Sequence, residues 1–254
     1  MRWENTNALN GERTHSWRAN EAPVKHFLDY ADERLRAMKL TRCTYCGGEN
    51  ETRDHVPSRV LLDEPFPYDL PVVGACFNCN NGFSSDEEYV ACLIECATVG
   101  STDPDKVTRP KVARILREKL GLRRLIEASH REEDGGHLWV PDAPRVRTVI
   151  RKLGLGHALF ELYEWPGEPQ SIWSRPFPAM SEEEISDFEE NQTSGLYPEI
   201  GSQGFSRMME DALGSGNGWV LVQEGRYRFR ATVGDRTVVR VVIGEYLAAE
   251  LTWP

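Results

Sequence analysis

Residues 43–46 read CTYC and residues 76–79 read CFNC, and these two short stretches decide the fold. A Cys-x-x-Cys turn directs two sulfur atoms at one point, so two such turns supply the four thiolates of a closed tetrahedral zinc site. Gly47 and Gly48 follow the first pair, where the backbone must bend sharply, and glycine allows this without strain. The spacing therefore predicts a structural Zn²⁺ ion held by Cys43, Cys46, Cys76 and Cys79. Because four thiolates leave no coordination position for water or substrate, we expect this zinc to hold the fold together rather than to catalyse.

The stretch between the two cysteine pairs carries residues suited to chemistry. Residues 52–58 read TRDHVPS, and Asn80 directly follows the last cysteine. The Asp54 carboxylate and the Asn80 carboxamide oxygen are hard ligands of the kind that Mg²⁺ or Mn²⁺ prefers. The neighbouring His55 can take a proton from water near neutral pH, which together with a hard metal is a minimal kit for phosphodiester hydrolysis. Two plainer interpretations stand beside this one: Asp-His is common in surface turns, and Asn80 suits a helix N-cap.

With these motifs the chain resembles the HNH endonuclease family in its zinc-stapled ββα-metal form, the His-Me finger nucleases. The match covers residues 40–97, under a quarter of the chain. The resemblance implies that His55 is the general base and that Asp54 and Asn80 hold one catalytic Mg²⁺ or Mn²⁺ ion. It also implies metal-dependent hydrolysis of DNA. The flanking Arg53 and Arg59 are candidates for contacts with phosphates.

One residue of the family pattern has no counterpart in this chain. The middle Asn, which orients the base in that family, falls where residues 70–74 read LPVVG. A backbone carbonyl near His55 could orient the imidazole instead, or activity could be weak or lost. Glu87 and Glu88, which follow the second cysteine pair, are candidates for an added metal ligand.

Composition limits the class of protein. With 254 residues, 40% of them hydrophobic and 28% charged, the chain is typical of a globular protein of one or two domains. It has neither an apolar run near eighteen residues nor an apolar leader at its start, so we expect no membrane span. Six cysteines, four of them in zinc spacing, suit a reducing cytoplasm. The net charge of −10 argues against a protein that coats DNA generally. Lys and Arg are enriched at residues 103–152, which either face nucleic acid or form a solvated helix face.

The hydrophobic pattern predicts an α+β fold in three parts. Residues 1–40 form a polar segment that ends in a helix over residues 23–39. Residues 41–100 form the HNH-like zinc domain. Residues 101–254 contain helices followed by an antiparallel β meander, which is a candidate module for binding a target or a partner.

Within the zinc domain we expect strands over residues 52–56 and 70–75. A helix should follow, with Ser84 or Ser85 as its N-cap and Gly100 at its end. Cys92 and Cys96 lie four residues apart on this helix and should be buried thiols rather than metal ligands.

The remaining elements follow the same reasoning. Residues 107–129 should be helical with a break at Gly121, and residues 144–163 should form a second helix in which His157 is packed and hydrogen-bonded. The acidic, glycine-rich turn between His130 and His137 should be an exposed loop. A short helix should begin after Ser181, which forms a capping box with Glu184, and the rest of residues 164–218 should be loop. The meander should consist of strands over residues 219–223, 226–233, 236–243 and 246–253.

The leading hypothesis is a metal-dependent HNH-type endonuclease, a hydrolase that acts on DNA. Its rival is a catalytically weak or inactive zinc-stapled scaffold that binds nucleic acid or protein, and a third hypothesis is RNA cleavage. A site with one metal ion and one His handles one strand at a time. Double-strand cleavage would therefore need a homodimer or other subunits, and the resemblance makes a defence-type complex plausible.

Overall fold

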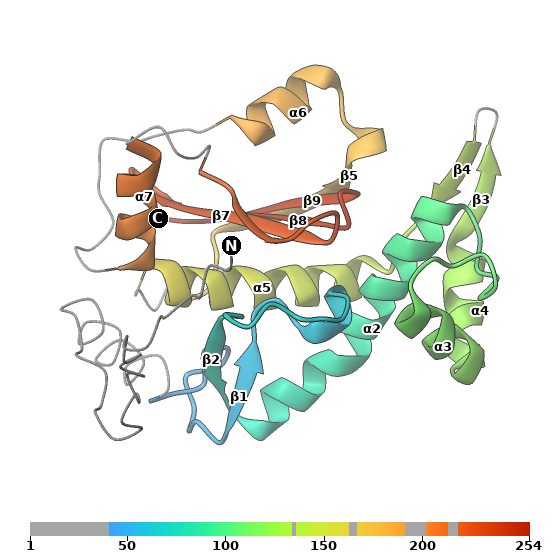
Figure 1. The fold of residues 1–254 in the computed structure, drawn as a ribbon, viewed down its shortest axis with the longest axis horizontal. Helices are drawn as coiled ribbons and strands as arrows, with labels where there is room; N and C mark the ends of the chain where they lie inside the picture. The colour runs from blue at the N-terminus through green and yellow to red at the C-terminus, as the bar shows by residue number, and fades with distance from the viewer. Residues whose placement is uncertain (1–40, 134–135, 163–166, 191–201, 213–217) are drawn as a thin grey trace, which may run out of the picture.

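The computed structural model describes residues 41–133, 136–162, 167–190, 202–212 and 218–254. The polar segment and helix expected for residues 1–40 lie outside these residues. The described chain is mixed α+β, with two small antiparallel sheets, helices α2 to α7 and a five-stranded antiparallel sheet at the C-terminal end (Figure 1). Helix α5 (Ala143–Leu162) runs through the middle, with the five-stranded sheet on one side and the β1–β2 pair on the other (Figure 1).

The first sheet joins β1 (Thr52–His55) to β2 (Val72–Ala75), with His55 opposite Val72. Both strands lie where the sequence predicts them. Between them the chain forms a short 3-10 helix, η1 (Arg59–Leu61). Helix α2 (Phe77–Val99) follows β2 almost at once, so the chain order at this site is strand, strand, helix.

Helix α2 begins earlier than predicted, because Cys76 rather than Ser84 or Ser85 is its N-cap. The Cys76 sulfur accepts a hydrogen bond from the Cys79 backbone N–H at 3.3 Å, which satisfies a free donor of the first turn. The cap alternative for Asn80 is wrong for the same reason, since Asn80 lies inside the helix. Gly100 ends the helix in the left-handed conformation, with φ of 67°, as predicted.

The region after α2 departs from the prediction at two places. Residues 107–129 form two helices, α3 (Pro110–Glu118) and α4 (Leu120–Ser129), and the break falls at Lys119 rather than Gly121. The stretch expected as an exposed acidic loop forms a hairpin of β3 (His130–Glu133) and β4 (Gly136–Trp139). Trp139 is buried and its ring lies 4.6 Å from the His130 ring, so an aromatic anchor outweighs the acidic composition.

The large sheet has the strand order β5-β9-β8-β7-β6. The predicted meander is confirmed and comprises β6 (Val220–Gln223), β7 (Tyr227–Val233), β8 (Thr237–Ile243) and β9 (Leu247–Trp253). The sequence did not predict β5 (Ser171–Pro176), which pairs with β9 along one edge. Pro176 argues against a strand in the sequence, because proline has no N–H to donate to a neighbouring strand. It is tolerated in β5 because an edge strand needs hydrogen bonds to only one neighbour.

Two helices cover other parts of the sheet region. Helix α6 (Glu182–Glu189) follows the 3-10 helix η2 (Phe177–Ala179) and carries the predicted capping box. Helix α7 (Gln203–Ala212) lies in a stretch that was predicted to be loop. Among the described residues, no helix combines the length and apolar character that crossing a membrane requires.

A single apolar cluster extends from the β1–β2 pair through α2 and α5 to the large sheet. Two glycines let α5 approach its neighbours closely. A Cβ atom at Gly154 would lie 2.4 Å from the Leu251 side chain in β9, and one at Gly156 would lie 2.5 Å from the Val56 side chain. Helix α5 thus joins the sheet to the segment that directly follows β1.

Candidate metal centre and the His55 cavity

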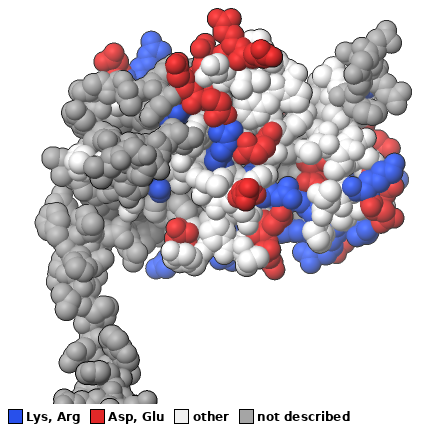
Figure 2. Space-filling model, turned by 45° about the horizontal axis from the view of Figure 1, so that its top comes forward, with Lys and Arg blue, Asp and Glu red and all other residues white. Residues whose placement is uncertain are grey.

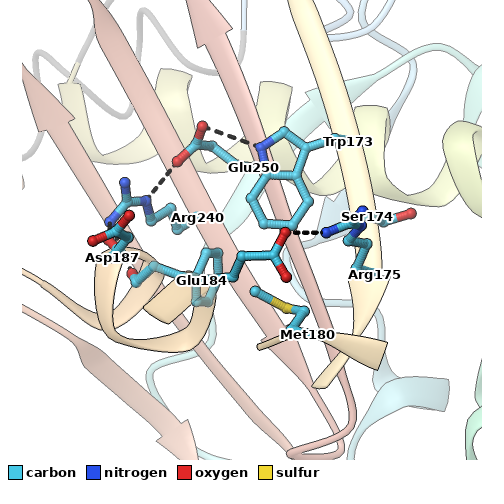
Figure 3. A pocket seen from close by; sticks show the side chains of 9 residues that line it. Trp173, Ser174, Arg175, Met180, Glu184, Asp187, Arg240 and Glu250 are labelled. Carbon is cyan, nitrogen blue, oxygen red and sulfur yellow. Dashed lines mark hydrogen bonds and ion pairs between the residues drawn. The ribbon is translucent and has the colours of Figure 1, made fainter. Parts of the chain in front are cut away.

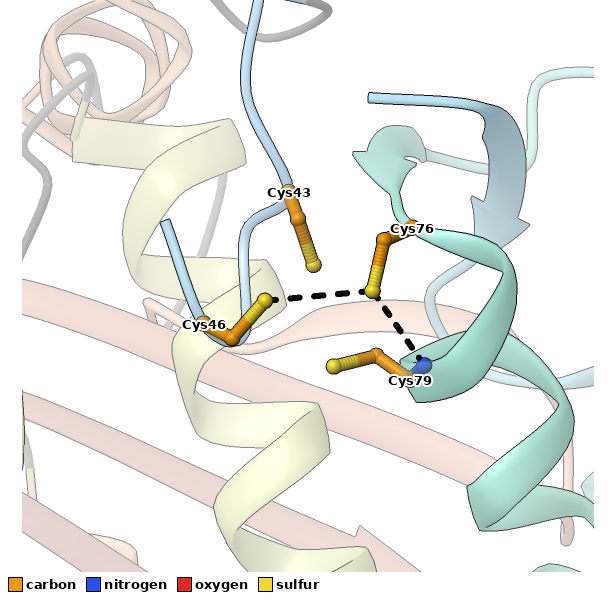
Figure 4. A group of neighbouring side chains, drawn as sticks. All are labelled: Cys43, Cys46, Cys76 and Cys79. Atoms are coloured by element: carbon orange, nitrogen blue, oxygen red, sulfur yellow. Dashed lines mark hydrogen bonds between the residues drawn. The ribbon is translucent and has the colours of Figure 1, made fainter. Parts of the chain in front are cut away.

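The four predicted cysteines come together at one end of the β1–β2 pair. Their Sγ atoms all lie within 4.8 Å of one another, close enough to hold a metal ion. Cys43 and Cys46 come from the turn before β1, and Cys76 and Cys79 from the start of α2 (Figure 4). Four sulfur donors in this space fit a structural Zn²⁺ ion.

Local structure explains why the first pair faces the second. The Cys43 N–H donates to the Gly48 carbonyl at 2.8 Å, and the Gly47 N–H donates to the Cys43 carbonyl at 2.9 Å. Gly47 has a φ of 72°, which favours glycine. Burial raises the pKa of the Cys43 thiol, but hydrogen bonds from the backbone of Cys76 and nearby residues outweigh burial and lower the pKa to about 7. A thiol that ionises near neutral pH is ready to bind a metal ion.

His55 lies at the last position of β1 and faces a large cavity. The cavity has a volume of about 850 Å³ and lies between the β1–β2 pair, α7 and the β6–β7 edge of the large sheet. The Nδ1 atom of His55 is buried and has no hydrogen-bond partner among the described residues. Burial, together with the positive charge of Arg59, lowers the pKa of His55 below its usual value. The imidazole is therefore neutral at pH 7 and able to accept a proton.

The cavity wall contains cationic, aromatic and aliphatic side chains, together with one carboxylate, Asp69. Arg53 from β1 and Arg207 from α7 supply positive charge to the wall, and Tyr68 is fully exposed beside them. Arg207 is held in place by the buried Glu161 at 2.9 Å and lies 5.9 Å from the centre of the Phe229 ring. Sequence reasoning did not select Arg207 for the site. The signal was weak: Arg207 is the one basic residue in the acidic stretch of residues 181–211.

Asp54 points away from this cavity into a buried cluster. Its Oδ2 atom accepts a hydrogen bond from the Tyr45 hydroxyl at 2.6 Å and lies 2.9 Å from Nζ of Lys152. The second oxygen, Oδ1, lies 3.1 Å from the same Nζ atom. The contacts of Asp54 therefore do not fit a divalent-cation ligand, because a lysine already supplies the positive charge.

The other predicted site residues make contacts of their own. Asn80 donates from Nδ2 to Thr52 Oγ1 at 3.0 Å and so ties α2 to β1. Glu87 joins the buried Lys152 cluster, and Glu88 pairs with Lys119 at the surface. Arg59 stacks over the Phe66 ring at 5.4 Å, and the structure does not place it among the residues that line the cavity.

A second cavity lies on the far side of the large sheet. It has a volume of about 500 Å³ and lies between the sheet and α6 (Figure 3). Its charged side chains pair with one another: Arg240 with Glu250 at 2.6 Å, and Arg175 with Glu184. The indole N–H of Trp173 also donates to Glu250 at 3.2 Å. The lining of this cavity contains guanidinium groups but no imidazole, whereas the first cavity has both.

Part of the basic segment of residues 103–152 is matched by acids. Arg109 is buried and pairs with Asp63 at 2.7 Å, and Arg145 pairs with Asp86 at 3.2 Å. Figure 2 shows basic and acidic side chains interspersed over one face of the described residues. Ion pairs within the protein thus neutralise some of the Lys and Arg side chains that are enriched in this segment.

The geometry combines three features near the β1–β2 pair. Four thiols lie close enough to hold a metal ion, a half-buried imidazole faces a large cavity, and a carboxylate is paired with a buried lysine. The imidazole and the carboxylate come from neighbouring positions of β1, and the thiols come from the turn before β1 and from the start of α2. Comparisons with protein-family models, curated proteins and solved structures found no match to this chain.

Proposed function

We propose that this chain is an HNH-type endonuclease that hydrolyses phosphodiester bonds of DNA with His55 as the general base. One observation carries the proposal: the imidazole of His55 faces a cavity whose wall also holds Arg53 and Arg207. A cavity of about 850 Å³ has room for a nucleotide unit, and two guanidinium groups suit a phosphate. The strand-strand-helix order beside four clustered cysteines adds support from the resemblance.

In this reaction His55 takes a proton from water. The Nδ1 atom is buried, so Nε2 is the ring nitrogen that receives the proton. The resulting hydroxide attacks phosphorus, and the bond from phosphorus to one ester oxygen breaks. That oxygen leaves and takes a proton from solvent, which yields a phosphate monoester and a free hydroxyl end. Arg53 and Arg207 would offset the negative charge that builds on the phosphate.

The lowered pKa of His55 gives this proposal a pH dependence. His55 acts as a base only when neutral, and its pKa lies below 6.5 because of burial and Arg59. We therefore expect the rate of cleavage to fall in acidic buffer with a midpoint below pH 6.5. A pH–rate profile of strand cleavage measures this fall of the rate at acidic pH.

The metal requirement forms a separate part of the proposal. One Mg²⁺ or Mn²⁺ ion on Asp54 and Asn80, as the resemblance implies, would need Lys152 to leave the Asp54 carboxylate. We include no catalytic step that passes through such an ion. The metal dependence of cleavage is measured with the same substrates, in buffer containing Mg²⁺ or Mn²⁺ and in buffer freed of both.

A second candidate function is a zinc-stapled scaffold that binds nucleic acid or protein without cleaving it. Two observations favour it. The Asp54 carboxylate forms an ion pair with Lys152, and Nδ1 of His55 has no orienting hydrogen-bond partner among the described residues. A base without an orienting group is less efficient, because the correct tautomer and ring position are not held. The acidic net charge of −10 is also compatible with a protein partner.

Cleavage assays separate the two functions. The substrates are supercoiled plasmid, single-stranded DNA and RNA, and the proteins are wild type, His55→Ala and His130→Ala, each with its zinc content measured. His130 lies on β3 and does not line the cavity, so its variant is the matched control. We expect nicking by wild type and by the control, and loss of nicking in His55→Ala. Cleavage that persists in His55→Ala would disprove the role of His55, and no cleavage of any substrate by zinc-loaded wild type would support the scaffold.

A further inference from the structure

A buried ionic cluster lies where β1, α2 and α5 meet. Lys152 is 1% exposed, and Asp54 and Glu87 are each 6% exposed. The Lys152 ammonium contacts both carboxylates and the Ser58 hydroxyl, which lies 2.7 Å from Nζ. The Phe83 ring covers the ammonium at 5.5 Å. The cluster thus places one positive charge between two negative charges with almost no access to water.

The hydrogen bonds of this cluster close on themselves. An ammonium group has three donors, and Lys152 uses them on Asp54, Ser58 and Glu87. Ser58 accepts from Lys152 and donates its own proton to Glu87. Tyr45 supplies a further donor to Asp54 at 2.6 Å. No donor of the ammonium is left to seek water.

The oxygen atoms around Lys152 are also those that a hard divalent cation would take. Two carboxylates and a hydroxyl are oxygen ligands of the type that Mg²⁺ and Mn²⁺ bind. An ammonium and a divalent ion cannot both occupy the same few ångströms, because their charges repel and their ligands coincide. Because Lys152 is covalently part of the chain, its ammonium stays among these oxygen atoms and excludes a divalent ion.

We propose that the Lys152 ammonium takes the place of a divalent cation between Asp54 and Glu87. Asp54 then acts as a positioning residue: its ion pair fixes the end of β1, and this end carries His55 to the cavity. The proposal holds for either function, because it concerns what binds Asp54 rather than whether the chain cleaves a substrate. Its test can therefore fail while the proposed function stands, and the reverse is also true.

Uptake of Mn²⁺ by zinc-loaded protein at pH 7 tests the proposal, with electron paramagnetic resonance as the readout. The proteins are wild type, Asp54→Asn, Lys152→Ala and the double variant. We expect wild type and Asp54→Asn to take up equal amounts of Mn²⁺. Lys152→Ala should take up about one more ion per chain, since it leaves two carboxylates without their cation. That additional uptake should be lost in the double variant.

Two outcomes would overturn the proposal. One is a Mn²⁺ ion that wild type binds and Asp54→Asn loses, because this would place a divalent cation on Asp54 in spite of Lys152. The other is a folded Lys152→Ala variant that takes up no more Mn²⁺ than wild type. If Lys152→Ala does not fold, the comparison of wild type with Asp54→Asn decides alone: equal uptake supports the proposal and unequal uptake overturns it.

Discussion

The two ends of the β1–β2 pair are held by different chemistry. At one end lie four thiols that can bind a metal ion, and one of them, Cys46, is exposed to solvent. At the other end the Lys152 ammonium lies between Asp54 and Glu87 and is almost completely buried. The first link depends on a metal supplied from outside, whereas the second is made entirely of the chain's own side chains.

The difference teaches how a small sheet can be fixed without a large core of its own. Strands of four residues bury little apolar surface, so each end needs a strong cross-link. Metal binding by thiolates contributes about 10–16 kcal/mol in small zinc domains. Breaking a buried ion pair costs about 3–5 kcal/mol, because one charge is left without a partner. The metal end should therefore be the stronger link when metal is present.

The largest expected effect is loss of the metal end. Cys76→Ser removes one ligand, while a serine can still cap α2, so it should abolish zinc binding and unfold the β1–β2 pair through loss of the metal. Amide hydrogen exchange of residues 43–80 measures the loss of protection. Cys96→Ser is the control, since Cys96 is buried on α2 outside the cluster. Unchanged protection in Cys76→Ser would contradict the role of the metal end.

The next effect sharpens the contrast between a buried and an exposed lysine. Lys152→Met should lower the free energy of unfolding by about 3–5 kcal/mol, because two buried carboxylates lose their cation. Lys119→Met is the matched control: it breaks a half-exposed pair with Glu88 and should cost at most about 1 kcal/mol. Urea unfolding measures both values. Equal losses in the two variants would show that the Lys152 cluster is no stronger than a surface pair.

A third effect tests how closely α5 packs on the segment after β1. Gly156→Ala places a Cβ atom 2.5 Å from the Val56 side chain and should lower the free energy of unfolding by about 2 kcal/mol. Gly121→Ala on α4 meets no atom within 4 Å, so it should stabilise the protein by about 0.5–1 kcal/mol. The two variants are compared by urea unfolding. Equal stability of Gly156→Ala and wild type would contradict the close contact.

The smallest expected effect concerns the face of α5 that packs on the large sheet. His157 is fully buried, donates or accepts at 2.8 Å with the Tyr227 hydroxyl, and stacks on Phe229, as predicted for a packed histidine. Burial lowers its pKa from 6.5 to about 3. The unfolded chain therefore takes up a proton first as the pH falls, and stability that is present above pH 6.5 is lost between pH 6.5 and 3.

Linkage gives a loss that approaches about 1.4 kcal/mol for each pH unit well below pH 6.5 and is smaller near pH 6.5, where the unfolded histidine is only half protonated. Between pH 6.5 and 5.5, wild type should therefore lose about 1 kcal/mol more than His157→Gln. Unfolding free energies of both proteins at the two pH values provide the measurement. Parallel losses would show that His157 does not titrate on unfolding, and would assign the acid sensitivity to other groups.

The sequence predicts the metal end and not the lysine end for a physical reason. The four clustered cysteines occur in two local motifs, and each motif fixes the geometry of its own turn. In the Lys152 cluster, Lys152 lies 98 positions from Asp54 and 65 positions from Glu87 in the sequence. No local pattern therefore indicates which lysine contacts Asp54. Arg207 escapes prediction in the same way, since only the tertiary fold brings α7 to the His55 cavity.

The same distinction explains the errors in secondary structure. Gly100 and the Ser181 capping box are local signals, and both predictions are confirmed. The start of α2 was missed because a cysteine sulfur serves as the N-cap, which is outside the usual cap residues. Strand β5 was missed because its evidence is the pairing with β9, which lies more than seventy residues away.

Metal stoichiometry tests the contrast between the two ends most directly. Wild type, Cys76→Ser and Asp54→Asn would be dialysed against Zn²⁺ and then Mn²⁺, and the bound ions counted by mass spectrometry. We expect about one zinc ion per chain in wild type and Asp54→Asn, none in Cys76→Ser, and no Mn²⁺ that depends on Asp54. Zinc retained by Cys76→Ser, or a second ion in wild type that Asp54→Asn loses, would contradict this account.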